Sequence, residues 1–427
     1  MKASYLKQAL KSLKDNPYSA FISILGIALS IGMIISLLVA IRAKTMNLSP
    51  ENNRTRSLYV KWVGVKEKES DNRVVNGFMS LKTIRECFQS LKIPEAVTVS
   101  SFIHSHLATL PGGGNQKRCY VLYTDDVFWK AFDFKFTEGN GYNKEEFDAG
   151  IKKIVISKQL ARTIFGTTGN VIGKEVQLNF IPYIVAGVVE DLSPITVATY
   201  AHAWIPYTSV QAGQSSDSEG ITGMYKCQIV AHSSSDFGAI RKEVEQQVSR
   251  YNTTLADYKV DFYGQPDTRY VEDHRFGAGY PDMQRSYLSD IGLILILLIV
   301  PAINLSGLTL SRMKKRITEL GIRKAYGATK NVLIWQVLSE QMVYSLIGGV
   351  LGLAFSYIGC SLMKDFGFNQ NNYFGLDIEA ALNPSVFITP GTFFLTFLFC
   401  VVINVLSAGI PAWRVSSTPI VESLRED

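Results

Sequence analysis

The sequence predicts an α-helical membrane protein with four transmembrane helices and one large α+β extracytoplasmic domain. Three observations carry this prediction. Four long runs contain no charged residue, a long segment at 42–290 separates the first run from the second, and basic residues gather beside the runs while that segment is nearly neutral. The chain of 427 residues is 47% hydrophobic and 19% charged, which fits a protein that lies partly in a membrane and partly in water.

Each apolar run is long enough to cross a bilayer as a helix. A helix rises ~1.5 Å per residue, so about 20 apolar residues cross the ~30 Å hydrocarbon core. Helices buried in a soluble core rarely stay free of charge for so long. The first run is also longer than the apolar part of a signal peptide, and no A-x-A-like cleavage site follows it. The predicted spans are residues 18–41, residues 291–310, the run 341–363 within a helix at 332–363, and residues 387–410.

The charges around these runs predict the orientation of the chain. Lysines precede the first run, and the basic stretch RMKKRITELGIRKAYGATK lies between the second and third runs. The loop 364–386 carries more acidic than basic residues. Because basic residues near span ends stay in the cytoplasm, we expect the termini 1–17 and 411–427 and the loop 311–331 on that side. Residues 42–290 and 364–386 are then expected outside.

The long outer segment contains two expected β-α-β halves. Apolar residues recur at helical intervals at Leu81, Ile84 and Phe88, and alternating patterns on either side predict strands. The expected elements are strands at 57–64 and 96–103 around a helix at 80–92 in the half 55–104, and strands at 224–232 and 257–264 around a helix at 236–250 in the half 222–265. We expect the halves to form one domain around an inserted β-rich subdomain at 105–212, with a loop at 211–221.

No pattern in the outer segment predicts catalysis, a metal site or nucleic-acid binding. His104 and His106 face one side of a predicted strand, but no Cys, Asp or Glu completes a set at zinc-like spacing. The glycine-rich stretch 111–117 lacks the Ser or Thr of a phosphate loop and predicts a hairpin tip. A nearly neutral outer segment offers no basic face for nucleic acid. Packing is the expected role of the outer cysteines, Cys87, Cys119 and Cys227.

Small residues cluster inside the third apolar run. Gly348 and Gly352 have the G-x-x-x-G spacing that lets two membrane helices approach closely. We therefore expect a helix–helix contact at these two glycines.

Several stretches together resemble a known family. They are VLYTDDVFWKAFDFKFTEG, IVISKQLARTIFG, NVIGKEVQL, YIVAGVVED, RITELGIRKAYGATK and PAWRVSSTPIVESL. Their order, the predicted four-span layout and the long first outer loop resemble MacB-type and FtsX-like ABC transporter permeases over essentially the whole chain.

The resemblance implies a non-catalytic permease subunit in the bacterial inner membrane. It implies a dimer with a second permease chain, identical or different, and a cytoplasmic ATPase partner whose work moves the outer domain. MacB-type proteins often carry the ATPase on the same chain. No GxxxxGK[ST] motif occurs in this sequence, so we expect a separate ATPase to hold ATP and Mg, with no cofactor in this chain. Lipoprotein, peptide or drug export with a periplasmic adaptor, or envelope signalling, are the implied roles.

The basic loop is the expected contact with the ATPase. Ile317, Leu320 and Gly321 fall at i, i+3 and i+4 of a short amphipathic helix, and glycine at position 321 permits close docking. Gly327 is suited to end this helix, and Thr329 to cap the next one. The alternative is a basic loop resting on anionic headgroups. The resemblance implies the motor contact in this loop, for which we propose Ile317, Glu319, Leu320, Gly321, Arg323, Lys324 and Gly327.

A second functional class also fits a large outer domain. This alternative is a motor-independent receptor or adhesin that the helices merely anchor in the membrane. We favour the permease because an anchor needs neither four spans nor a patterned basic loop. Retention of an ATPase during purification discriminates the two classes.

Overall fold

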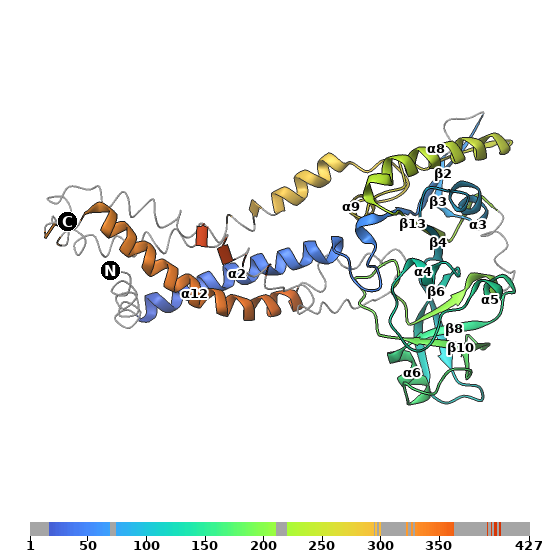
Figure 1. Ribbon diagram of the computed structural model, residues 1–427, viewed down its shortest axis with the longest axis horizontal. Coiled ribbons are helices and arrows are strands. Elements are labelled where there is room, and N and C mark those ends of the chain that lie inside the picture. Colours follow the sequence, from blue (N-terminus) through green and yellow to red (C-terminus); the bar gives the residue numbers. More distant parts are fainter. Residues whose placement is uncertain are drawn as a thin grey trace. The chain divides into compact units, whose positions relative to one another are not determined.

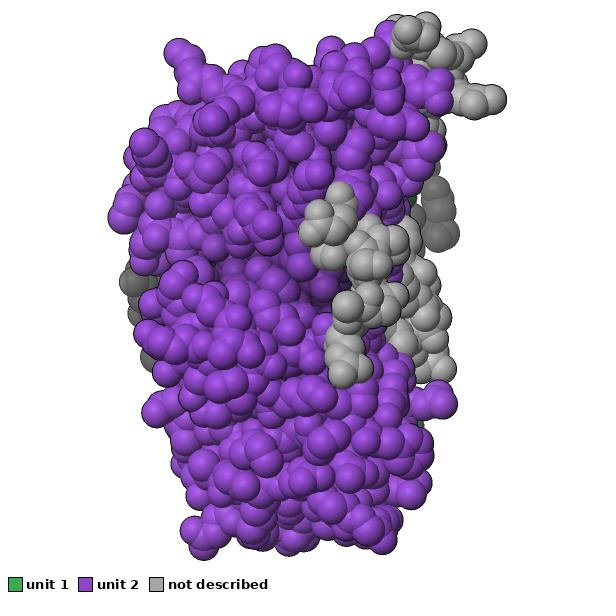
Figure 2. Space-filling view, turned by 90° about the vertical axis from the view of Figure 1, so that its right-hand side faces the viewer, with its two compact units in different colours: residues 1–43, 284–369, 381–427 green, residues 44–283, 370–380 purple. Residues whose placement is uncertain are grey.

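Figure 1 shows the computed structural model of the chain. The structure describes residues 17–68, 74–210, 220–293 and 329–362, and the single positions 295, 296, 299, 322, 326, 327, 391, 394, 397, 398, 401 and 402. The chain divides into two compact units, which Figure 2 colours separately. Unit 1 comprises residues 1–43, 284–369 and 381–427, and unit 2 comprises residues 44–283 and 370–380.

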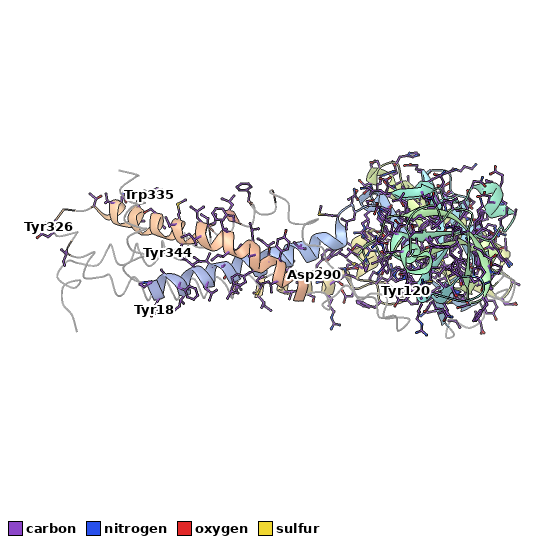
Figure 3. The ribbon with its side chains drawn as sticks, turned by 90° about the horizontal axis from the view of Figure 1, so that it is seen from below. Tyr18, Tyr120, Asp290, Tyr326, Trp335 and Tyr344 are labelled. Carbon is purple, nitrogen blue, oxygen red and sulfur yellow. The ribbon has the colours of Figure 1, made fainter. Side chains whose placement is uncertain are left out.

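Two long helices dominate the described part of unit 1. They are α2 (Pro17–Thr45) and α12 (Lys330–Leu362). Pro17 opens α2, where its missing N–H costs nothing, and α12 begins directly after Thr329. The two helices lie side by side, and the hydroxyl of Ser36 donates a hydrogen bond of 3.2 Å to the carbonyl of Ser356 (Figures 1 and 3).

The described residues support only part of the predicted membrane layout. Among them, Met342–Gly359 of α12 is the one helical stretch long and apolar enough to cross a membrane, and Ala20–Ser36 of α2 is a shorter apolar stretch. These stretches lie in the third and first predicted spans. The four-span arrangement stays a prediction, because most of the second and fourth spans, 291–310 and 387–410, lies outside the described residues. So do nearly all residues of the predicted 1–17, 311–331, 364–386 and 411–427 segments.

Unit 2 is built on a large, mostly antiparallel sheet. Its described strands form one 14-stranded sheet in the order β11-β8-β10-β9-β5-β6-β4-β13-β3-β2-β14, with β1 beside β13, β12 beside β3 and β7 beside β10. The pairs β8–β10 and β6–β11 are parallel. The strands are β1 (Ser57–Val60), β2 (Trp62–Glu67), β3 (Val74–Met79), β4 (Ala96–Ser101), β5 (His104–Thr109), β6 (Gln116–Thr124), β7 (Phe136–Gly139), β8 (Lys153–Ser157), β9 (Glu175–Leu178), β10 (Ile181–Val189), β11 (Ala203–Pro206), β12 (Thr222–Gly223), β13 (Tyr225–Val230) and β14 (Tyr258–Asp261).

Short helices accompany the strands, and together they confirm the α+β character of the outer domain. The helices of unit 2 are α3 (Leu81–Ile84), which continues as a π-helix at Arg85–Gln89, α4 (Phe128–Ala131), α5 (Lys144–Asp148), α6 (Lys158–Phe165), α8 (Phe237–Thr254) and α9 (Arg269–Asp273). Single 3-10 turns lie at Arg54–Arg56, Tyr207–Ser209 and Ser234–Asp236.

Two hydrophobic cores define two lobes of unit 2, and a third cluster, which includes Val230 of β13 and Trp204 of β11, joins them. The first lobe contains β1–β4, β12–β14, α3 and α8, and its core includes Ile84, Phe88, Cys227, Ile240 and Val244. Both expected β-α-β halves contribute side chains to this core. The second lobe contains β5–β11 with α4, α5 and α6, and is centred on a separate core around β6, β8 and β10. The sheet runs through both lobes, from β5 and β6 to β4.

In the first lobe, one predicted strand was wrong and another strand was missed. The strand expected at 57–64 is two strands, because the chain breaks at Lys61 and only β1 pairs with β13 while β2 pairs with β3 and β14. Strand β3 was not predicted at all. Its centre is Asn76-Gly77, a pair typical of turns. Tertiary packing decides its conformation, since Phe78 stacks on Trp62 with ring centroids 4.4 Å apart.

Two other expectations are confirmed. Residues 111–117 contain the turn of the β5–β6 hairpin, in which Gly112, Gly113 and Gly114 have φ values of 81°, 90° and 115° that favour glycine. The outer cysteines Cys87, Cys119 and Cys227 are free and buried, as packing residues should be. The expected loop at 211–221 lies almost wholly outside the described residues.

Candidate functional site

Most of the residues proposed for the ATPase contact lie outside the described residues. These are Ile317, Glu319, Leu320, Gly321, Arg323 and Lys324. Further along, the amide of Tyr326 donates to the carbonyl of Ile322 at 3.1 Å, and Gly327 has φ +91°. This is the geometry of one helical turn followed by a residue that favours glycine. Lys330 then begins α12.

The structure places Gly348 and Gly352 of α12 against α2. A Cβ atom on Gly348 would lie 2.6 Å from Ile27 Cγ2, and one on Gly352 would lie 2.7 Å from Ile31 Cγ2. Such distances leave no room for a side chain, so the two backbones approach as closely as glycine allows. The same seam contains Gly32 of α2, which the sequence reasoning missed.

His104 and His106 are engaged within the second lobe. The ring of His104 stacks on Tyr123 at a centroid distance of 4.2 Å. His106 Nε2 lies 2.8 Å from the hydroxyl of Tyr123, and its Nδ1 lies 2.9 Å from Asn179 Nδ2. Burial lowers the pKa of His104 to about 4, so the ring is neutral near pH 7. Across the described part of the chain, no group of three His, Cys, Asp or Glu side chains could hold a metal.

Buried charges concentrate where the chain enters and leaves the outer domain. The incoming segment, residues 46–56, follows α2, and the outgoing segment, residues 262–283, leads toward the next predicted span. We define the anchor residues as Glu51 and Arg54 of the incoming segment, and Gln265, Asp267, Arg269, Glu272 and Arg275 of the outgoing segment.

The incoming segment is anchored to the second lobe. Arg54 Nε donates to Glu51 Oε2 at 2.6 Å, and both side chains are completely buried. The other oxygen of Glu51 accepts from the amides of Ala198 and Thr199, at 2.9 and 3.1 Å. Arg54 Nη2 donates to the carbonyl of Ile195 at 2.7 Å. The incoming segment therefore grips the loop between β10 and β11.

The outgoing segment is anchored to the first lobe. Asp267 and Tyr59 of β1 exchange two backbone hydrogen bonds, of 2.8 and 2.9 Å. The carboxylate of Asp267 in turn accepts from Arg275 Nε at 2.5 Å and Nη2 at 2.8 Å. Such bidentate, charge-assisted pairs hold a fixed geometry. They therefore fix the outgoing segment beside β1.

The break between β1 and β2 is also held by the outgoing segment. Gln265 Oε1 accepts from the amides of Lys61 and Trp62, at 2.9 and 3.2 Å. Glu272 pairs with Lys61 and with Arg269, the latter at 2.5 Å. Burial alone would raise the pKa of Glu272, but the two cations lower it to about 2. Glu272 is therefore a carboxylate at any physiological pH.

The two connections to the membrane unit thus overlap at the first lobe, and only the incoming one also holds the second lobe. The incoming segment continues directly into β1, and Arg56 Nη1 donates to the carbonyl of Ala231 at 2.6 Å. A displacement of the incoming segment therefore acts on β1 and on the β10–β11 loop of the second lobe. A displacement of the outgoing segment acts on β1 and β2 of the first lobe. Sequence reasoning missed the anchor residues, since charged residues near a loop are ordinarily exposed. The signal for Glu51 and Arg54 was the cluster of both charge signs in ENNRTR, shortly after the first apolar run.

The described chain thus combines the apolar helices α2 and α12 with a large α+β domain that is anchored at both of its connections. The chain belongs to the ABC transporter permeases with a MacB-like periplasmic core domain, whose family profile matches residues 20–247, followed by an FtsX-like permease C-terminal region that matches residues 291–420.

The chain is also similar to individual ABC transporter permeases. The chain is 25% identical over 241 residues to an uncharacterized ABC transporter permease, YknZ, of Bacillus subtilis, covering 56% of this chain and 57% of that protein. It is 23% identical over 431 residues to the macrolide export ATP-binding/permease protein MacB 1 of Yersinia pestis, covering 99% of this chain and 60% of that protein. The chain therefore spans somewhat more than half the length of these relatives.

Two solved structures also match part of the chain. The extracellular domain of YknZ matches with a TM-score of 0.34 and 16% identity, over 47% of this chain and 99% of that one. A domain of a permease protein from Porphyromonas gingivalis matches with a TM-score of 0.37 and 16% identity, over 54% and 94%.

Proposed function

We propose that this chain is the permease subunit of an ABC transporter that transmits movement to its outer domain. A separate cytoplasmic ATPase binds ATP and Mg, and its cycle moves the membrane helices of a permease dimer in the bacterial inner membrane. The observation that carries the proposal is that buried charges anchor both connections, the incoming one on the β10–β11 loop and the outgoing one beside β1 and β2. Movement of the helices then changes the relation between the lobes without a solute passing through the bilayer.

Energetics support the anchors as transmitting contacts. Removing one partner of a buried ion pair costs about 3–5 kcal/mol, because the other charge is left without compensation. The side chains of Glu51 and Arg54 are fully buried, and those of Asp267 and Arg275 are 4% and 3% exposed. When a connecting segment held by such pairs is displaced, we expect it to move the part of the outer domain to which it is bound rather than to separate from it.

The proposal places the motor contact in the basic loop. Gly321→Leu keeps every charge of the loop but adds bulk where close docking is expected. We expect it to lower ATPase association and stimulated ATP hydrolysis while expression and membrane insertion stay normal. Lys314→Arg is the matched control and should leave both unchanged. Equal activity of the two variants would mean that the loop only contacts lipid headgroups.

Purification separates the permease from the alternative of an anchored receptor or adhesin. The full chain is extracted from native membranes, and every retained protein is identified by mass spectrometry. We expect an ABC ATPase, with a second permease chain and a periplasmic adaptor as further partners. Retention of no ATPase under several mild detergents would favour the receptor or adhesin. Retained lipoprotein, peptide or drug cargo would identify the role in export.

A further inference from the structure

Three aromatic side chains stack on the side of the first lobe's sheet that faces away from its apolar core. Trp62 of β2 and Phe78 of β3 lie directly opposite each other in register, and their ring centroids are 4.4 Å apart. The ring of Phe102, which follows β4, continues the stack at 4.0 Å from the ring of Phe78. We call these three residues the aromatic face.

Strand alternation explains why these rings point away from the core. In a strand, successive side chains point to opposite faces of the sheet. Val63 and Met79, which follow Trp62 and Phe78 in sequence, belong to the apolar core of the first lobe. The opposite face of such a sheet ordinarily carries polar side chains. A cluster of partly exposed rings on that face therefore marks a contact site.

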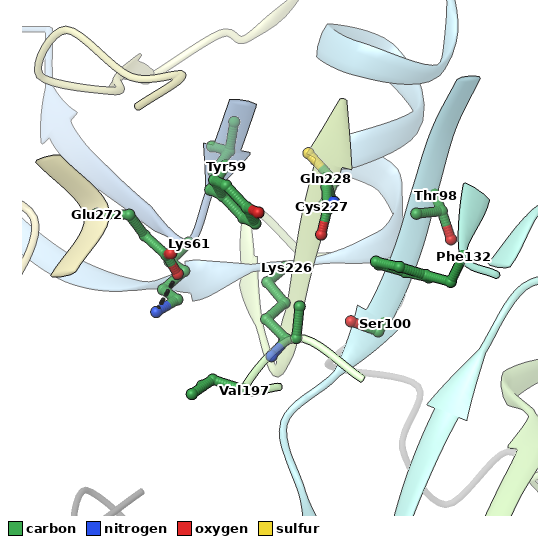
Figure 4. A pocket seen from close by; sticks show the side chains of 12 residues that line it. Tyr59, Lys61, Thr98, Ser100, Phe132, Val197, Lys226, Cys227, Gln228 and Glu272 are labelled. Carbon is green, nitrogen blue, oxygen red and sulfur yellow. Dashed lines mark ion pairs between the residues drawn. The ribbon is translucent and has the colours of Figure 1, made fainter. Parts of the chain in front are cut away.

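A positive charge borders the aromatic face. The ammonium group of Lys226 lies 5.4 Å from the ring centroid of Phe102. In Figure 4, Lys226 projects from β13, and a dashed line joins Lys61 to Glu272. Glu272 also pairs with Arg269, and no acidic side chain of the described residues forms an ion pair with Lys226. An acidic side chain is therefore the complementary neighbour of this border.

One segment of unit 2 has the side chains to cover this face. Residues 370–380 belong to unit 2, although the residues on either side of them belong to unit 1. Their sequence, QNNYFGLDIEA, contains the adjacent rings of Tyr373 and Phe374. The other parts of unit 2 outside the described residues, 69–73 and 211–219, contain no aromatic residue. Because aromatic rings pack favourably on one another, this segment matches the aromatic face.

The segment also matches the border in charge. It contains Asp377 and Glu379 and no basic residue. Asp377 follows Phe374 by three residues, which span up to about 10 Å in an extended chain. If Phe374 packs on the aromatic face, Asp377 can therefore reach Lys226 at its border.

We propose that the segment 370–380 docks on the aromatic face through its two rings, and that Asp377 pairs with Lys226. Only residues 363–369 separate this segment from the end of α12 at Leu362. The docking therefore gives the first lobe a connection to α12, in addition to the incoming and outgoing segments. It does not depend on the proposed coupling to an ATPase.

Cross-linking tests the docking in the full-length protein in lipid nanodiscs, in a chain without its native cysteines. Asn372→Cys is combined with Asn76→Cys, an exposed position on the same side of β3 as Phe78. The matched control combines Asn372→Cys with Lys242→Cys, an exposed position of α8, which packs on the opposite side of the sheet. We expect a short bismaleimide to link the first pair within one chain and to leave the control pair unlinked. Mass spectrometry of the linked peptides measures both.

The outcomes of this experiment have separate meanings. Linking of both pairs to the same extent, or of neither pair, would overturn the proposal. A link between two chains, seen as a doubled mass on a denaturing gel, would also overturn it and would assign the aromatic face to a second copy of the protein.

Charge exchange tests the assigned ion pair. Asp377→Lys places two positive charges together, so linking of Asn372→Cys to Asn76→Cys should fall to the level of the control pair. Lys226→Glu in the same chain should restore the linking. Asp365→Lys, which lies outside the docking segment, is the matched control and should leave the linking unchanged. Linking that survives Asp377→Lys would contradict the pairing with Lys226.

Oxidation by hydroxyl radicals tests the assigned rings, because mass spectrometry then reports the exposure of each side chain. Phe374→Ser removes one covering ring, so oxidation of Trp62 should rise severalfold. Asn371→Ser, in the same segment, is the matched control and should change nothing. Unchanged oxidation of Trp62 in a Phe374→Ser protein that keeps the wild-type thermal unfolding curve would contradict the docking of the rings.

Discussion

Single buried charges fix the outer domain to its two connections. Glu272 illustrates how burial and neighbouring charges oppose each other. Burial disfavours the charged form of Glu272, while Lys61 and Arg269 favour it more strongly. A carboxylate whose pKa is lower in the folded than in the unfolded state stabilises the fold above the unfolded pKa. That stability is lost as the pH falls through the folded pKa.

The first prediction concerns Glu272→Gln. The pKa of Glu272 falls from 4.5 to about 2 on folding, so its charge adds about 3 kcal/mol to the free energy of unfolding above pH 4.5. We expect the variant to be destabilised by about that amount near neutral pH, and the difference to vanish toward pH 2. Urea unfolding followed by tryptophan fluorescence at a series of pH values measures it.

An exposed ion pair is the control for this prediction. Asp148 pairs with Lys144 at 3.8 Å, but the two side chains are 57% and 72% exposed. Surface pairs of this kind contribute about 0–1 kcal/mol, so Asp148→Asn should change stability little at any pH. A Glu272→Gln curve that runs parallel to the wild type across the whole pH range would refute the role of the charge.

At the scale of elements, the α2–α12 seam depends on residues without side chains. Gly32 faces Phe355 of α12, and Gly359 faces Ser36 of α2, so both helices contribute glycine to the contact. Figure 3 shows the side chains that α2 and α12 carry, among them Tyr18, Trp335 and Tyr344. Lipid tails are as apolar as the side chains of these helices, so the hydrophobic effect does not drive the helices together. Close packing holds them in contact instead.

The second prediction therefore concerns Gly352→Leu. A side chain here would overlap Ile31 and force the helices apart, at a cost of about 1–3 kcal/mol. We expect a lower temperature of unfolding in detergent. Gly292→Leu is the matched control, because no atom of a described neighbouring residue lies within 4 Å of a Cβ at that glycine. Equal thermal stability of the two variants would mean that the seam is not tightly packed.

The sequence predicted well those elements whose apolar residues recur at regular intervals or whose turns contain several glycines. The face of α8 with Ile240 and Val244 was evident from spacing alone, and the β5–β6 turn from its glycines. Strand β3 was missed because the pair Asn76-Gly77 at its centre is typical of a turn. Only pairing with β2 makes these residues part of a strand. The anchors were not predictable, since only the tertiary fold brings Glu51 to Ala198 and Asp267 to Tyr59.

At the scale of the whole molecule, the proposed permease requires one defined orientation in the membrane. The third prediction uses single cysteines in a chain without its native cysteines, Cys87, Cys119, Cys227, Cys360 and Cys400. Asn140→Cys and Gln370→Cys should react with an impermeant thiol reagent in spheroplasts, whereas Lys315→Cys should react only after lysis. Labelling at position 315 in sealed cells would reverse the predicted orientation.

The fourth prediction separates the two anchors. Arg54→Met fills similar space without the charge and leaves Glu51 buried and unpaired, so the incoming segment should release the β10–β11 loop. We expect loss of transport or signalling while ATPase association stays normal, because the basic loop is untouched. Arg162→Met, on the outer surface of α6, serves as the control. Full function of an Arg54→Met protein whose β10–β11 loop has become protease-sensitive would show that the anchor transmits nothing.

Both connections hold β1, but only the incoming one also holds the β10–β11 loop, and this difference has a kinematic consequence. If both connecting segments are displaced together, the outer domain is carried as a rigid body and its internal geometry stays constant. Only the difference between the two displacements shears one lobe against the other. The outer domain is therefore insensitive to motions that its membrane helices share. It responds only to motions in which the helices move relative to one another.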